Sequence, residues 1–262
     1  MLQVVGMIHR YGNNVHFFDK PYLLGLLAKL CQPTTFQPDI NRYVDYLYSQ
    51  LLAEVVDSFF PTEPISLMTR MHSDHPEIEL KSHQVARTAK AVCVNLARAG
   101  TYPSHICYDK LHLFLNPENI RQDHIFAARA VDSDQHVTNT ELNGFKIGGS
   151  IHDSLVLIPD PMGATGSTIM STVNHYKQNV PGKPIRFIAM HLIVTPEYLK
   201  RISETHPDVT IVAIRLDRGL SSAKALDFEP GTLWDEEKGL NSKDYIVPGG
   251  GGFGEIMNNS FV

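Results

Sequence analysis

The sequence predicts an α/β protein with a mostly parallel β-sheet flanked by helices, an N-terminal helical segment and a β-arm. Two observations predict this fold class. Short apolar runs rich in Val and Ile have the composition of strands that are buried on both faces, at 90–97, 154–160, 185–194 and 209–217. Helical stretches lie between them, at 103–115, 166–176 and 196–205. Strands and helices that alternate in this way form a parallel sheet.

The first third of the chain has the pattern of two helices. Asp19 followed by Pro21 is typical of a helix start, and a second helix should open near Asp39. The second helix has apolar residues at the three-and-four spacing of one helical face, at Val44, Leu47, Leu51 and Val55. Pro61 then ends it, so we expect residues 1–64 to form an N-terminal helical part.

Two other stretches lack a clear period. Residues 121–153 are polar, and we expect them to form a flap or a long β-arm. Residues 221–238 are expected to be an insertion with Trp234 as its one bulky anchor, and the acidic residues 235–237 to be a solvated face. With these additions, we expect the whole chain, 1–262, to fold as one domain.

The histidines of the sequence do not predict a metal site. His72 and His75 lie in MHSDHPE and His83 follows, but no zinc-ligand frame surrounds them. We expect this segment to be a solvated loop.

Composition limits the class of partner. The 262 residues carry 23 Lys and Arg against 28 Asp and Glu, a net charge of −5, which argues against a nucleic-acid partner but not against a local anion pocket. The three cysteines have no CxxC spacing, so a reducing compartment is favoured over a disulfide framework. No apolar run has membrane-spanning length, and the start of the sequence does not resemble a signal peptide. We therefore expect a cytoplasmic protein without a membrane partner.

The segment 156–168, VLIPDPMGATGST, contains the clearest candidate site. A buried strand ends at Asp160, and a turn of small residues leads into a helix. The turn 164–168 brings together backbone N–H groups, Thr and Ser hydroxyls and the positive end of a helix dipole, which suits a phosphate monoester. Gly163 and Gly166 permit close approach of a ligand. The alternative is an ordinary strand-to-helix turn, which would not need an acid, glycines and hydroxyls together.

Several segments resemble the uracil phosphoribosyltransferases of the type I phosphoribosyltransferase family. DPMGATGST is similar to the loop of that family that binds 5-phosphoribosyl diphosphate, and LARAG at 96–100 is similar to its pyrophosphate-contacting turn. YIVPG at 245–249 resembles its base-binding strand. Residues 19–30 and 195–217 also agree with the family, so the resemblance covers nearly the whole chain.

The resemblance implies transfer of the phosphoribosyl group to uracil, which gives UMP and pyrophosphate. It implies catalytic roles for Asp160, Arg98 and Arg129. It implies that 5-phosphoribosyl diphosphate contacts Asp160, Pro161, Met162, Gly163, Ala164, Thr165, Gly166, Ser167, Thr168, Arg98 and Ala99. It implies that the base contacts Tyr245, Ile246, Gly250, Gly251 and Gly252. It also implies Mg²⁺ carried mainly by the substrate, no dedicated protein metal ligands, and a homodimer or a larger homo-oligomer.

The chain departs from the family pattern at two places. Gly252 stands where the family has an acid, with Glu255 at a later acidic position, and residues 128–134 replace the family's YRDEET flap. Two alternatives therefore stay open. One is a regulatory protein that binds a nucleotide or 5-phosphoribosyl diphosphate with impaired catalysis, and the other is a phosphoribosyltransferase for another nucleobase.

The glycine run at 249–254 also matches GxGxxG, at Gly249, Gly251 and Gly254. We do not expect a dinucleotide fingerprint here, because too few residues follow for a helix to open. A flexible tail is possible on composition alone, but YIVPG directly before the run favours a base-binding loop.

Overall fold

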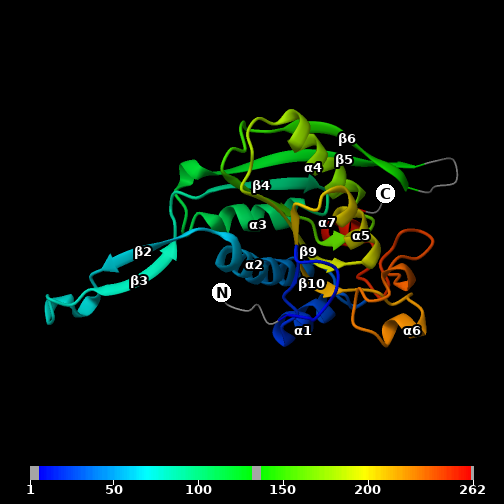
Figure 1. Ribbon diagram of the computed structural model, residues 1–262, viewed down its shortest axis with the longest axis horizontal. Helices are drawn as coiled ribbons and strands as arrows, with labels where there is room; N and C mark the ends of the chain where they lie inside the picture. Colours follow the sequence, from blue (N-terminus) through cyan, green and yellow to red (C-terminus); the bar gives the residue numbers. More distant parts are fainter. Residues whose placement is uncertain (1–5, 132–136, 261–262) are drawn as a thin grey trace.

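The computed structural model describes residues 6–131 and 137–260, and for 127–143 it describes only the backbone. In this described part, an eight-stranded sheet forms the centre, helices cover both of its faces, and a two-stranded arm projects to one side (Figure 1). The sheet is therefore the frame that positions any site at its strand ends.

The strands of the main sheet are β1 (Val15–Phe17), β4 (Lys90–Ala97), β5 (Ile120–Val131), β6 (Val137–Lys146), β7 (Ser154–Pro159), β8 (Met162–Gly163), β9 (Arg186–Val194) and β10 (Val209–Leu216). The arm consists of β2 (Thr62–Leu67) and β3 (Leu80–Val85). The helices are α1 (Pro21–Leu30), α2 (Asp39–Phe59), α3 (Thr101–Leu111), α4 (Ser167–Asn179), α5 (Pro196–Thr205), α6 (Ala223–Leu226) and α7 (Phe253–Asn258). Three short 3₁₀ turns are η1 (Arg70–Ser73), η2 (Pro117–Asn119) and η3 (Trp234–Glu236).

The main sheet has the strand order β1-β10-β9-β7-β4-β5-β6, with β8 beside β9. Every pair in it is parallel except β5 with β6. The predicted fold class is thus confirmed. Because β4, β7, β9 and β10 run in one direction, the turns that follow them lie along one edge of the sheet, where ligands bind in open α/β sheets.

Side-chain alternation along the strands divides the core into two layers. Leu155 and Leu157 of β7 belong to a cluster with α1, α2, α3 and α7, whereas Val156 and Ile158 belong to a second cluster with α4 and α5. Successive side chains point to opposite faces of a strand, so a strand covered on both faces is apolar at every position. This is why the four apolar runs were recognisable in the sequence.

Most predicted boundaries agree with the structure within a few residues. β4 and α5 have the predicted bounds, and α1 and α2 begin at Pro21 and Asp39. The helix expected at 103–115 is α3, which starts two residues earlier and ends at Leu111, because turns replace the helix after that residue.

The N-terminal part is not purely helical. Residues 15–17 form β1, which pairs in parallel with β10 at the edge of the main sheet. Three residues are too few for a recognisable alternating pattern, so the helical expectation for 1–64 is wrong at this strand and at the first residues of β2.

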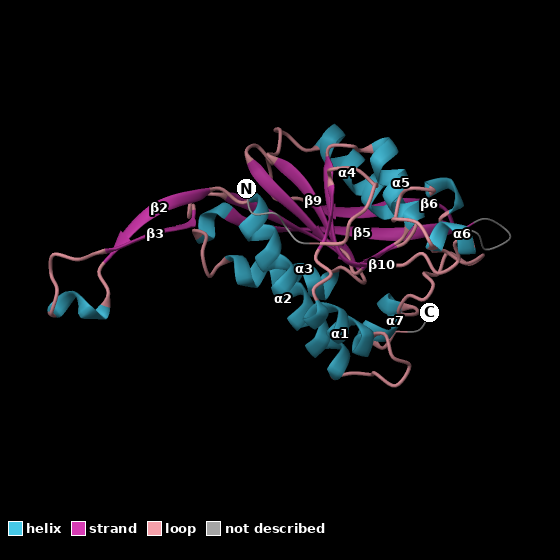
Figure 2. Ribbon diagram, turned by 60° about the horizontal axis from the view of Figure 1, so that its bottom comes forward, coloured by secondary structure: helices cyan, strands magenta, loops and turns pink. Residues whose placement is uncertain are grey.

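The projecting arm was not predicted. Residues 62–67 and 80–85 pair as an antiparallel hairpin that extends away from the two layers (Figure 2). Its residues are mostly exposed, so no buried face imposes an alternating pattern. The segment with His72 and His75, expected to be a loop, contains the 3₁₀ turn η1 at the tip of this arm. The described residues include no group of three or more His, Cys, Asp or Glu side chains that could hold a metal ion.

The stretch 121–153, expected to be a flap or β-arm, contributes β5 and β6. Both strands continue the main sheet beyond β4, so this hairpin widens the sheet at its edge. Of the two expected forms, the stretch thus has the β structure of an arm, but as part of the main sheet. Residues 132–136 between the two strands lie outside the described part of the chain.

The insertion 221–238 packs against the N-terminal segment. Trp234 contacts the Tyr11 ring edge-on, with centroids 5.0 Å apart, and its Nε1 donates to the Pro196 carbonyl at 3.1 Å. The expected anchor is confirmed. The expectation of a solvated face at 235–237 is wrong for Glu237, which is buried because its carboxylate accepts from the Tyr11 hydroxyl and pairs with Arg218.

Among the described residues, no helix combines the length and the apolar character needed to cross a membrane. The three cysteines, Cys31, Cys93 and Cys107, are free thiols.

Candidate functional site

The turn after β7 carries the first part of the site. The main-chain N–H of Asp160 donates to the Met190 carbonyl at 3.0 Å, so the turn is fixed to β9 from its first residue. Gly166 then adopts the left-handed conformation, with a φ of 82°, and α4 begins at Ser167. Because only glycine adopts this conformation without strain, Gly166 is what allows the strand to turn directly into the helix.

The same turn is supported by α5. The hydroxyl of Thr195, at the N-terminus of α5, donates to the Ala164 carbonyl at 2.7 Å. A Cβ at Gly163 would lie 2.9 Å from Val194 Cγ1 and 3.2 Å from Tyr198 Cγ, so a larger residue would push the turn away from α5. The close packing at Gly163 therefore fixes the position of the turn.

Polar groups of both helices converge at the start of α4. The hydroxyls of Thr165 and Ser167 lie 3.2 Å apart, and Arg201 of α5 donates through Nη1 to the Ser167 hydroxyl. The first turn of any α-helix has N–H groups without acceptors inside the helix, and its dipole favours an anion there. Hydroxyls, a guanidinium and a helix N-terminus thus meet at one place, which is the donor set of a phosphate site.

The side chain of His191 stabilises the turn after β7. It is fully buried in the middle of β9, its Nδ1 lies 2.6 Å from the Asp160 carbonyl oxygen, and its Nε2 lies 2.6 Å from the Tyr198 hydroxyl. Burial lowers the pKa of His191 to about 4, so the ring is neutral at pH 7. Because a carbonyl can only accept, Nδ1 carries the proton and donates to Asp160, and the Tyr198 hydroxyl donates to Nε2.

The turn after β4 lies next to this one. A Cβ at Gly100 would lie 2.9 Å from the carbonyl oxygen of Pro159, the last residue of β7. Only a glycine allows this approach, and it brings Arg98 and Ala99 to the same edge of the sheet as Asp160. The Arg98 guanidinium is partly exposed and contacts Glu255 at 3.3 Å and the Ser260 carbonyl at 3.0 Å.

An ion pair at the end of β10, between the half-buried Arg215 and the buried Asp217, holds the glycine run. Arg215 makes a two-pronged contact with Asp217, at 2.6 and 2.8 Å. Asp217 in turn accepts from the Gly249 N–H at 2.7 Å, and Arg215 donates to the Gly249 carbonyl at 3.2 Å. With donors and acceptors on both sides of Gly249, the backbone at the start of the run is fixed.

Two expectations about this terminal segment are wrong. Residues 245–249 do not form a strand; Ile246 makes one isolated bridge to Leu240, because Pro248 has no N–H to donate and Gly249 turns the chain with a φ of 62°. A helix does open after the glycines, since residues 253–258 form α7. Phe253 and Met257 of α7 are buried in the core, which stabilises so short a helix.

The three segments meet. A Cβ at Gly250 would lie 3.4 Å from Met162 Cε, and a Cβ at Gly254 would lie 3.7 Å from Ala99 Cβ. The turn after β7, the turn after β4 and the terminal glycine run therefore contact one another at the carboxyl edge of the sheet. The sequence predicted each segment separately, and the fold brings them together.

The structure places the remaining predicted residues as follows. Pro161 is buried, and its carbonyl accepts from the N–H groups of Leu192 and Ile193 at 3.0 and 3.1 Å. Tyr245 is exposed beside the glycine run. The backbone of Arg129 pairs with Thr140 in the β5–β6 hairpin, but its side chain lies outside the described part, as do those of the other residues at 127–143.

Sequence reasoning missed the residues that support the site. His191 is the one polar residue inside the apolar run FIAMHLIV, and a polar residue at a fully buried position needs a partner, which is a usable signal. Arg215 lies near the end of β10 and Asp217 follows its last residue, and this spacing of two allows their side chains to meet. Arg201 gave no local signal, because its contact with Ser167 spans 34 residues.

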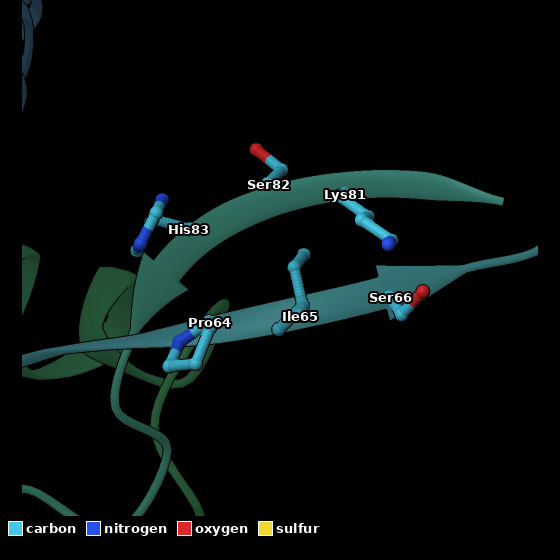
Figure 3. Close-up of a pocket in the computed structure, with 6 residues that line it drawn as sticks. All are labelled: Pro64, Ile65, Ser66, Lys81, Ser82 and His83. Carbon is cyan, nitrogen blue, oxygen red and sulfur yellow. The ribbon is translucent and has the colours of Figure 1, made fainter.

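A hollow in the described part of the surface lies away from this edge. It has a volume of about 380 Å³ and is formed on the arm by Pro64, Ile65, Ser66, Lys81, Ser82 and His83 (Figure 3). None of these residues belongs to the three segments that meet at the sheet edge, and none of them lies at the N-terminus of an α-helix. We therefore assign the candidate active site by the convergence of side chains at the sheet edge.

Solved structures with the same fold define the class. A protein from Aquifex aeolicus aligns with a TM-score of 0.69 at 19% identity, over 93% of this chain and 97% of that one. An adenine phosphoribosyltransferase from Trypanosoma brucei aligns with a TM-score of 0.50 at 12% identity, over 84% and 90%. The chain thus has the fold of a type I phosphoribosyltransferase.

Sequence comparison identifies the family. The model of the uracil phosphoribosyltransferase family matches residues 17–231, and the chain belongs to this family. The uracil phosphoribosyltransferase of Pyrococcus furiosus is 31% identical over 94% of this chain and 90% of its own length. That of Mycoplasmoides gallisepticum is 33% identical over 91% and 95%. The match to the Thermococcus sibiricus enzyme, 33% identical, spans 115 residues, only 40% of that relative's length.

Proposed function

We propose that this protein transfers the phosphoribosyl group of 5-phosphoribosyl diphosphate to uracil, giving UMP and pyrophosphate, a reaction of pyrimidine salvage. One observation carries the proposal beyond family membership. The glycine run adjoins both the turn after β7 and the turn after β4: Gly250 lies beside Met162, and Gly254 lies beside Ala99. Groups suited to a sugar phosphate, to its leaving group and to a flat base therefore lie on segments that adjoin one another.

The turn after β7 would hold the ribose and its 5-phosphate. Asp160 is placed at the strand end to accept from the ribose hydroxyls, with Pro161, Met162 and Gly163 shaping the turn. The phosphate would be bound by the residues that line the start of α4, Ala164, Thr165, Gly166, Ser167 and Thr168. Arg201 adds a positive charge through its contact with Ser167.

The leaving group would be bound by Arg98, Ala99 and Arg129. The C1–oxygen bond to pyrophosphate breaks, the bond from C1 to the uracil nitrogen forms, and that nitrogen loses its proton. The sugar passes through an oxocarbenium-like state, so the protein contributes mainly orientation and stabilisation of the departing negative charge. A guanidinium suits this task because it stays charged and binds phosphate oxygens in pairs.

Uracil would be recognised by main-chain groups at Ile246 and Gly251, with Tyr245, Gly250 and Gly252 around them. An amide N–H and a carbonyl together match the imide edge of uracil. Gly251 has a φ of 77°, a conformation that other residues rarely adopt, so the run can present its backbone where side chains would otherwise intervene.

The donor set at the sheet edge fits Mg²⁺ that arrives with the substrate. Asp160 is the carboxylate that would face it, and the described residues include no group of three or more His, Cys, Asp or Glu side chains that could hold a metal ion. Mg²⁺ keeps several waters and takes most of its other ligands from phosphates. When bound, it neutralises charge on the diphosphate.

Two features of the site favour a second candidate function. Arg98 is paired with Glu255, and Gly252 supplies no carboxylate. A regulatory protein that binds 5-phosphoribosyl diphosphate or a nucleotide with impaired catalysis would tolerate both features. The third candidate function is that of a phosphoribosyltransferase for another nucleobase.

Pyrophosphate release separates these functions. We expect purified protein with 5-phosphoribosyl diphosphate and Mg²⁺ to release pyrophosphate with uracil, and not with hypoxanthine, guanine or orotate. Addition of EDTA should abolish the release. Binding of 5-phosphoribosyl diphosphate without turnover would favour the regulatory protein, and release with another base would favour the third candidate function.

We also propose that two copies associate through the arm, in the cytoplasm. A two-stranded hairpin is only marginally stable alone in water, and the arm exposes Leu67, Met68, Ile78 and Leu80, at 49% to 69%. A second copy of the chain would cover these side chains. The free thiols Cys31, Cys93 and Cys107 support a reducing compartment.

A further inference from the structure

Glu255 lies between two segments of the candidate site. Its Oε1 is 3.3 Å from Nη2 of Arg98, and its Oε2 is 2.6 Å from the point that a Cβ on Gly252 would occupy. The side chains of Arg98 and Glu255 are 40% and 30% exposed. The pair is therefore accessible to solvent, and an arriving ligand can reach it.

The absence of a side chain at Gly252 is what gives Glu255 this position. A Cβ there would have to displace the carboxylate, because heavy atoms do not approach to 2.6 Å without one of them moving. The backbone itself does not require glycine, since the φ of Gly252 is −72°. The glycine thus makes room for the carboxylate of Glu255.

Groups of this chain already use part of the hydrogen-bonding capacity of Arg98. In the present arrangement Nη2 donates to Glu255, while Nη1 donates to the carbonyl and hydroxyl of Ser260. A diphosphate that binds Arg98 must displace the carboxylate of Glu255 or share the guanidinium with it. It must also approach the negative charge of Glu255, and both effects oppose binding of the polyanion.

We propose that Glu255 is a built-in competitor of pyrophosphate for Arg98 and thereby sets the affinity of the site for its diphosphate ligands. This inference rests on the proposed function, in which Arg98 binds the leaving group. Glu255 is displaced when 5-phosphoribosyl diphosphate binds and returns to Arg98 as pyrophosphate leaves. It acts through Arg98 and is a positioning residue.

Titration calorimetry with inorganic pyrophosphate tests the proposal without requiring turnover. We expect Glu255→Gln to lower the Kd for pyrophosphate by roughly two- to tenfold, the range expected for loss of a partly exposed ion pair and of a repulsive charge. Gly252→Ala should lower it similarly, because the added Cβ pushes the carboxylate away from Arg98. Asp57→Asn, at an exposed position of α2, removes the same charge outside the site and should leave the Kd unchanged.

The double variant, Gly252→Ala with Glu255→Gln, shows whether both substitutions act through the same carboxylate. If Gly252→Ala acts by moving Glu255, combining it with Glu255→Gln should add nothing to either single change. Effects that multiply would contradict the role of Gly252, and equal affinities in wild type and Glu255→Gln, or no pyrophosphate binding in either, would overturn the proposal.

Steady-state kinetics give a second readout. Glu255→Gln should lower the KM for 5-phosphoribosyl diphosphate and strengthen inhibition by pyrophosphate, while the KM for uracil stays within twofold. A purely structural role of Glu255 would not tighten diphosphate binding selectively. The proposed function itself fails on a different result, the absence of pyrophosphate release from wild-type protein that still binds pyrophosphate.

Discussion

Arg201 brings a positive charge from α5 to the first residue of α4. Its guanidinium donates to the Ser167 hydroxyl, and its Cδ lies 3.5 Å from the point that a Cβ on Gly166 would occupy. A charged hydrogen bond to a phosphate contributes more than a neutral one. Arg201 is therefore the residue of α5 that we expect to act on the 5-phosphate.

We predict that Arg201→Ala raises the KM for 5-phosphoribosyl diphosphate by about tenfold, the equivalent of roughly 1.4 kcal/mol, with little change in the KM for uracil. Arg201→Lys should recover part of the loss. Lys200→Ala is the charge-matched control, because Lys200 is the neighbouring residue and pairs with Asp235 of the insertion. Equal KM values in the Arg201 and Lys200 variants would show that Arg201 has no specific role.

The two arginines show what could be predicted at the residue scale. Arg98 belongs to a local motif, LARAG, and could be singled out from its neighbours in the sequence. Arg201 could not, because its contact with Ser167 spans 34 residues. Glu255 was noted as an acid near the glycine run, but its pairing with Arg98, 157 residues away, could not be predicted. Only the packing of α5 and α7 against the sheet edge produces these contacts.

At the scale of elements, β9 contributes a neutral histidine to the support of the site. His191 is fully buried, and its pKa is lowered to about 4 by burial, against an ordinary value near 6.5. Below pH 6.5 the unfolded chain takes up a proton that the folded chain does not, so folding stability falls as the pH falls towards 4.

We predict that the titration of His191 alone lowers the free energy of unfolding by roughly 3 kcal/mol between pH 7 and pH 4. Each pH unit between the two pKa values corresponds to about 1.4 kcal/mol. Urea unfolding of wild type and of His191→Gln at several pH values measures this contribution. The variant should be less stable at pH 7, because it loses hydrogen bonds, but should depend less steeply on pH. Parallel pH curves would contradict the assignment.

Elements were predictable where they are buried. The four central strands are apolar at nearly every position because helices cover both faces of the sheet, and their bounds were predicted closely. The arm was missed because β2 and β3 are mostly exposed, and α7 was missed because its burial depends on Phe253 and Met257 reaching the core. Helix or strand formation in these segments is decided by tertiary contacts.

At the scale of the whole molecule, the arm extends beyond both helical layers (Figure 2). We predict that wild-type protein has the mass of a dimer or a larger assembly in light scattering. Met68→Glu together with Ile78→Glu should shift it towards the monomer, because the charges would be buried against a second copy. Leu113→Glu is the matched control, since Leu113 is 81% exposed outside the arm. A monomeric wild type would refute association through the arm.

The central claim is that uracil and 5-phosphoribosyl diphosphate react at the edge of the sheet where the two turns and the glycine run meet. The most direct measurement is pyrophosphate release with uracil and Mg²⁺, compared between wild type and Asp160→Asn at equal Tm. The account predicts uracil-dependent release by the wild type and a loss of at least a hundredfold in the variant, the scale on which removal of one group that stabilises a transition state acts. Release that is unaffected by Asp160→Asn, or no release by a folded wild type, would contradict it.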